Sequence, residues 1–178
     1  GMDIWVDHLT WDLYRVERKA ASAAVNNQIK PRVAYSRGAG RYLIVWQDGR
    51  SGVTWDVYGQ RLDGAGALSG TAMGVFLGAH HDLAPVVAGH AAAAEFLVAF
   101  QQDISGAEQW EIYARQVTGA GAIGAPFAVR EWYNVQVARI AEMDLEWKLQ
   151  GLSPEQRAHR AYAVRHAARL KARELMIN

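Results

Sequence analysis

Short apolar runs separated by glycine-rich or polar connectors characterise the chain up to about residue 131. Between residues 31 and 77 the β-forming residues gather in four runs, at residues 33–36, 42–47, 55–62 and about 72–77. Runs of this length, bounded by Gly and Asp clusters, predict β-strands. The run at 42–47 is apolar on both faces, so we expect a central strand that is covered on each side.

The same pattern returns 54 residues later. The run Pro31-Arg-Val-Ala-Tyr35 becomes Pro85-Val-Val-Ala-Gly89, and Tyr42-Leu-Ile-Val-Trp46 becomes Phe96-Leu-Val-Ala-Phe100. One inserted residue and one later deletion both fall in connectors, as loop tolerance predicts for true structural repeats. The sequence therefore predicts two equivalent units, at about residues 31–84 and 85–131.

A partial unit precedes these two, because Asp3-Ile-Trp5 aligns with Asp56-Val-Tyr58. We place it at residues 3–25, so that the β-repeat region covers residues 3–131. Each full unit is expected to form a four-stranded antiparallel sheet that stacks on its neighbour, as the blades of a β-propeller do. The predicted fold class is mainly β, with two incomplete propeller-blade-like units and a C-terminal α-helical hairpin.

The pattern P-x-V-A-Y … Y-L-I-V-W-Q-D … W-D-V-Y-G-Q-R-L-D-x-x-G resembles the tandem β repeats of large bacterial surface-associated and secreted proteins. The resemblance implies a non-enzymatic scaffold or recognition module, outside the cell or on its surface, in long propeller-like arrays. Because a propeller has at least about four blades, we expect this chain to be a fragment of a larger protein. We also expect it to associate with copies of itself or with neighbouring repeats, and to bind a glycan or a protein.

A helical extension is predicted for residues 132–178, where apolar residues adopt helical spacing. Ser153, Pro154 and Gln156 have the arrangement of an N-cap, a first helical residue and a capping box, so a helix is expected from Pro154 to about Met176. Residues 151–178 carry a net charge of +4, from six basic and two acidic side chains.

This basic segment supports an alternative function. Its sequence pattern, L-S-P-E-Q-R-A-x-R-A-Y, resembles the beginning of the C-terminal domains of bacterial polymorphic toxins. The resemblance implies a truncated toxin whose C-terminal helix faces nucleic acid, which Arg165, His166, Arg169 and Arg173 would contact. Under the leading interpretation these side chains form a solvated basic face, and nucleic acid is not a partner.

Composition excludes several classes of protein. The chain has 178 residues, no cysteine and a formal charge of +1, so disulfides, thiolate metal sites and a whole-protein case for nucleic-acid binding are absent. No apolar run reaches the roughly 18 residues of a membrane span, and no signal peptide opens the chain. None of the familiar catalytic, phosphate-binding or metal motifs is present, so we predict no enzyme, no cofactor and no metal site.

A few residues remain as ligand-binding candidates. Asp48 and Arg50 are placed to form an ion pair at a hairpin tip or part of a calcium site. Trp55 and Trp110 lie near loop tips at matching repeat positions, where flat aromatic faces can stack on sugars; a carbohydrate-binding lectin is therefore a second alternative. The segment His80-His81-Asp82 aligns with Asn26-Asn27-Gln28, and this favours a turn-capping role over a metal site.

Overall fold

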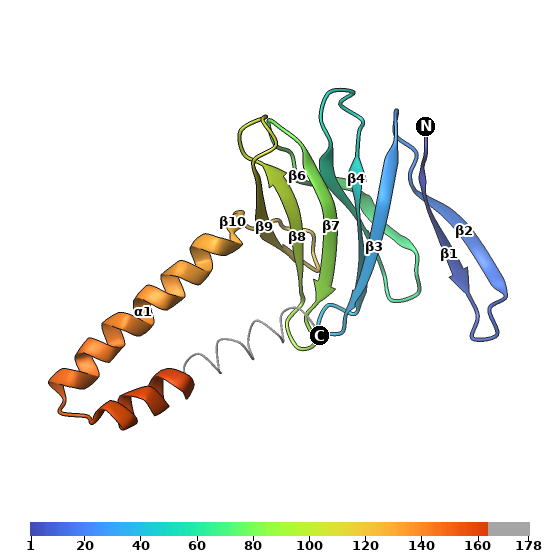
Figure 1. The fold of residues 1–178 in the computed structure, drawn as a ribbon. Coiled ribbons are helices and arrows are strands. Elements are labelled where there is room, and N and C mark those ends of the chain that lie inside the picture. Colours follow the sequence, from blue (N-terminus) through green and yellow to red (C-terminus); the bar gives the residue numbers. More distant parts are fainter. Residues whose placement is uncertain (164–178) are drawn as a thin grey trace.

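The computed structural model describes residues 1–163, apart from the side chains of residues 132–138, 140 and 141. It is mainly β: a two-stranded sheet and two four-stranded antiparallel sheets lie side by side, and helices follow at the C-terminal end (Figure 1). The predicted fold class is confirmed. Among the described helices, none combines the length and the apolar character that crossing a membrane would need.

The first repeat unit forms a sheet in which each strand pairs with the next along the chain. Its strands are β3 (Gln28–Ser36), β4 (Arg41–Asp48), β5 (Asp56–Leu62) and β6 (Leu68–Phe76). Strand β4 is central, as its apolar pattern predicts, and Leu43, Val45 and Trp46 in it are fully buried. Burial on both faces requires a cover on both faces.

The second unit repeats this topology. Its strands are β7 (Asp82–Gly89), β8 (Glu95–Asp103), β9 (Trp110–Thr118) and β10 (Phe127–Ala128). Strand β10 has only two residues, because helix α1 (Val129–Leu149) begins at once after it. The helix thus starts three residues before the boundary expected at residue 132, inside the span assigned to the second unit.

The partial unit is the two-stranded sheet of β1 (Ile4–Leu9) and β2 (Arg15–Ser22). By sequence these strands correspond to β5 and β6, the last two strands of the first unit. The partial unit therefore corresponds to the second half of a full unit. The described chain contains no counterparts of β3 and β4 for it.

Two apolar clusters hold the three sheets in a row. The larger lies between the two full units and includes Leu43, Val45, Phe96, Val98 and Phe100. The smaller joins the two-stranded sheet to the first unit and consists of Ile4, Ala21, Ile44, Trp46 and Leu62. Strand β4 supplies both clusters, because successive side chains point to opposite faces of a sheet.

The helical extension begins its second helix at Pro154, as predicted, and the structure describes this helix as far as residue 163. The capping box is confirmed: the Gln156 backbone N–H donates to Ser153 Oγ at 3.2 Å, and the Ser153 N–H donates to Gln156 Oε1 at 2.9 Å. Arg157 bonds Asp144 of α1 at 3.2 Å and ties the two helices together. The predicted continuation to Met176, with Arg165, His166, Arg169 and Arg173, lies outside the described residues.

Candidate functional site: a groove beside the first strand

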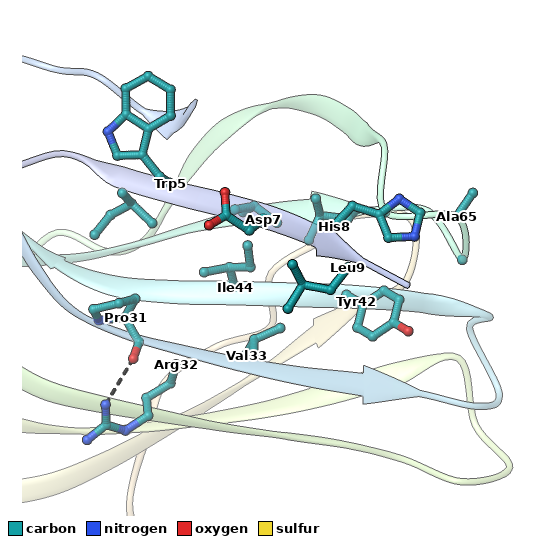
Figure 2. A pocket seen from close by; sticks show the side chains of 15 residues that line it. Trp5, Asp7, His8, Leu9, Pro31, Arg32, Val33, Tyr42, Ile44 and Ala65 are labelled. Carbon is teal, nitrogen blue, oxygen red and sulfur yellow. Dashed lines mark hydrogen bonds between the residues drawn. The ribbon is translucent and has the colours of Figure 1, made fainter. Parts of the chain in front are cut away.

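An apolar groove of about 470 Å³ lies between the two-stranded sheet and the first full unit. Strand β1 forms one wall, and residues of β3, β4 and β5 form the floor. Figure 2 shows Leu9, Val33, Tyr42 and Ile44 around this space, with Trp5 directed away from it. The groove adjoins the smaller apolar cluster, because Ile44 and Leu62 belong to that cluster and also line the groove.

One edge of β1 is unpaired at the groove. Six residues of β1 have partners in β2, whereas no strand of the described chain pairs with the opposite edge. The counterpart strand β5 differs, because it pairs with β4 on one side and with β6 on the other. An open strand edge presents backbone N–H and C=O groups that can bind an extended polypeptide.

The floor of the groove is exposed at positions whose counterparts in the second unit are buried or half-buried. Val33 of β3 is 61% exposed, while its repeat counterpart Val87 is partly buried against the core between the units. Pro31 is exposed and its counterpart Pro85 is buried. The difference arises because β3 and β4 pack on β7, while no equivalent strands within residues 1–163 pack on β3.

The backbones of the two full units approach each other closely at Gly89 of β7. A methyl group built on Gly89 would lie 2.2 Å from the carbonyl oxygen of Tyr35, so only glycine admits the β3 backbone here. Ser36 Oγ also donates to the His90 carbonyl at 3.0 Å. In the first unit the position of Gly89 is taken by Tyr35, whose ring contacts that of Tyr42 at a tilt of 49°, with centroids 4.7 Å apart.

Charged groups at the groove are few. Arg18 of β2 forms an ion pair with Asp7 of β1, with Arg18 Nε 2.6 Å from Asp7 Oδ1, and the hydrogen bond from Arg18 lowers the pKa of Asp7. His8 lines the groove beside the turn that holds Gly66. Among the residues that the structure describes, no three His, Asp or Glu side chains are grouped to hold a metal ion. The chemistry of the groove is therefore apolar contact together with backbone hydrogen bonding.

Asp48 and Arg50 form an ion pair at 2.6 Å that is built into the contact between sheets. Burial opposes the charge on Asp48, but hydrogen bonds from Arg50 and from Trp46 Nε1 hold its pKa below the usual value. Arg50 also stacks on Tyr58, 3.7 Å from the ring centroid, and reaches Ser22 of β2 at 3.5 Å. The two oxygens of Asp48 are thus engaged within the protein.

Trp55 and Trp110 occupy equivalent places in separate units. Trp55 precedes β5, is half-buried, and lines a hollow of about 230 Å³ together with Asn26 and Asn27. Trp110 begins β9, is 39% exposed, and is not among the residues around that hollow. The structure therefore does not bring the two tryptophans to one site.

A buried acidic position escaped the sequence analysis. The Asp82 side chain is fully buried; Gly78 N–H donates to its Oδ2 at 3.1 Å, and its Oδ1 has no partner. Burial raises its pKa to about 7. His81 Nδ1 accepts the Trp55 N–H at 3.2 Å, a contact with the segment that precedes β5, and the turn-capping role of His80-His81-Asp82 stays a prediction. Asp82 aligns with Gln28, which is also buried, but the burial of both side chains is visible only in the three-dimensional structure.

The groove was not predicted either, although the sequence contained a sign of it. The partial unit aligns with β5 and β6 alone, and the described residues contain no counterparts of β3 and β4 for it. Comparisons of this chain with protein-family models, curated proteins and solved structures find no match.

Proposed function

We propose that the protein is a non-enzymatic β-repeat recognition module, and that the groove beside β1 is its contact surface. The observation that carries the proposal is the difference in solvent exposure between Val33 and Val87, which occupy the same repeat position: Val33 is exposed, whereas Val87 is partly buried against the core between the units. An exposed valine beside an open strand edge and an apolar hollow favours binding to another polypeptide.

The repeat architecture supports the same proposal. Each unit buries an apolar face against its neighbour, and the array leaves such a face open at Val33. A scaffold role is compatible with this arrangement, since stacked units hold the groove on sheets rather than on loops. The resemblance to tandem repeats of bacterial surface and secreted proteins suggests where such a module works, in a larger protein outside the cell.

The test is site-specific photocrosslinking in the cell that makes the protein. A photoreactive amino acid replaces Val33 in the groove or, as a matched control, Val86 of β7, which is 51% exposed. We expect a discrete adduct from position 33, with the attached residue identified by mass spectrometry, and no adduct from position 86. Absence of adducts from position 33 and from Leu9, on the opposite wall, would reject a recognition role for this surface.

A further inference from the structure

We infer that the groove accepts one extended segment of a partner polypeptide, which adds to the open edge of β1 as a third strand and carries aliphatic side chains at alternate positions. The inference rests on the proposed function and specifies the ligand class. It follows from the internal repeat, because the chain itself shows what occupies the equivalent place in the first unit.

That occupant is β4. It pairs with β5 over seven residues and directs Leu43 and Val45 toward the second unit, where they enter the larger core. Leu43 lies opposite Arg61 and Val45 opposite Gly59. These two aliphatic side chains, two residues apart on one face, are what an equivalent strand would direct toward the groove floor.

The register transfers to β1 through the alignment of Asp3-Ile-Trp5 with Asp56-Val-Tyr58. Under this alignment Arg61 corresponds to His8 and Gly59 to Val6. An added antiparallel strand would therefore place its two aliphatic residues beside His8 and Val6. Both residues line the groove, and Val6 already packs on the smaller apolar cluster.

The same interface continues from the folded core into the groove. Ile44 and Leu62 belong to the smaller cluster, where Ile4 of β1 packs, and they also line the groove. An added strand would extend this packing over Val33, in the way that β3 and β4 cover Val87. The groove is thus the unfilled part of an interface that the chain has already begun.

The structure favours a single strand over a hairpin. In the contact between the full units, β3 fits because Gly89 leaves room for its backbone. In the groove, Tyr35 stands at the corresponding position, and its ring, which contacts the tilted ring of Tyr42, takes the space that an equivalent of β3 would need. The place of a β4-like strand, between β1 and Val33, remains open.

A second copy of the chain does not meet this requirement with its own β1. Strand β3 lies below the open edge, since Pro31, Arg32 and Val33 line the groove together with β1. A second β1 would arrive with its own first unit packed beneath it through Ile4. That sheet would occupy the space of β3, so a segment without an attached sheet is the better occupant.

The test uses the full chain and a fluorescent peptide with the β4 sequence, Arg41–Asp48. We expect saturable binding by fluorescence anisotropy. Binding should weaken at least tenfold for the protein variant Val33→Lys, and remain unchanged for Val86→Lys, a substitution at a similarly exposed valine. A peptide with Leu43→Asp and Val45→Asp should not bind, and N-methylation of the backbone amides that face β1 should abolish binding by the parent sequence.

Three results would overturn the inference. The first is a lack of peptide binding to protein that is folded and monomeric. The second is equal binding of the aspartate-substituted peptide. The third is concentration-dependent self-association that Val33→Lys removes, which would make a second copy the occupant. In each case adducts from position 33 to a folded surface of another protein would still support the proposed function, so the two failures are distinguishable.

Discussion

The two full units have nearly the same strands but different neighbours, and the neighbours decide which residues are buried. Phe96 and Tyr42 share a repeat position. Phe96 is fully buried because β4 packs over it, whereas Tyr42 remains half-buried at the groove. The repeated sequence pattern thus specifies the face of the sheet to which a side chain points. Burial depends on the sheet stacked on that face.

Truncation at this shared position should give the largest difference. We expect Phe96→Ala to lower the free energy of unfolding by about 3–5 kcal/mol, because it opens a cavity in the core between the units. Tyr42→Ala should cost roughly half as much, since part of its ring already contacts water. Urea denaturation followed by tryptophan fluorescence measures both values. Equal costs would contradict the comparison.

Asp82 and Gln28 share another position, and the carboxyl group makes the second unit sensitive to pH. The folded-state pKa of Asp82, about 7, lies above its unfolded value of 3.8. Its contribution to stability is therefore complete below about pH 4 and is lost as the pH rises through 7.

We expect Asp82→Asn to raise the free energy of unfolding by about 2–4 kcal/mol at pH 8, with little effect at pH 4. Asp3→Asn, at an exposed site, is the control and should leave the stability curve unchanged at both pH values. Thermal unfolding across this pH range measures the effect. A gain for Asp82→Asn that is equal at pH 4 and pH 8 would refute burial of a charged carboxylate as its cause.

Gly89 and Tyr35 form a third matched pair. Gly89→Ala should destabilise the protein by about 1–3 kcal/mol, because the added methyl group meets the Tyr35 carbonyl of β3. Tyr35→Ala should cost less, about 1 kcal/mol or below, through loss of the ring contact with Tyr42. Chemical denaturation of the two variants side by side provides the measurement, and a neutral Gly89→Ala would disprove the close approach of the units.

The smallest effect is expected at Val33. Replacement by Lys should change the free energy of unfolding by no more than about 0.5 kcal/mol, since the side chain is already exposed. Val87→Lys should be clearly destabilising, because it places a charge against the core between the units. Comparable losses for the two variants would mean that the groove floor is covered in solution.

Much of the fold follows from periodicity in the sequence. The double-sided apolar run of β4, the glycine-rich connectors and the 54-residue offset predicted the two four-stranded antiparallel units, and Ser153 with Gln156 predicted the helix start. The short β10 was not predicted. Its sequence continues the repeat as far as Val129, but the helix begins there and ends the strand after two residues.

The candidate site was less accessible to prediction. Asp48 and Arg50 were identified as an ion pair or a calcium site, but only the structure shows that Arg50 reaches Ser22 of the partial unit. The groove lies where the described residues contain no counterparts of β3 and β4 for the partial unit, and only the alignment of the repeats can indicate such a difference in the sequence. The burial of Asp82 depends on residues distant in the sequence, so it can be seen only in the three-dimensional structure.

The row of sheets also sets the order in which the molecule can come apart. The two-stranded sheet contributes two buried residues, Ile4 and Ala21, and the partly buried Val6 to the small cluster, while the full units share a larger core on both sides of their contact. Local opening has the lowest free energy where such contacts are fewest. Amide exchange should therefore be fastest at β1 and β2 and slow toward β4 and β8, so that the array frays from its N-terminal end inward.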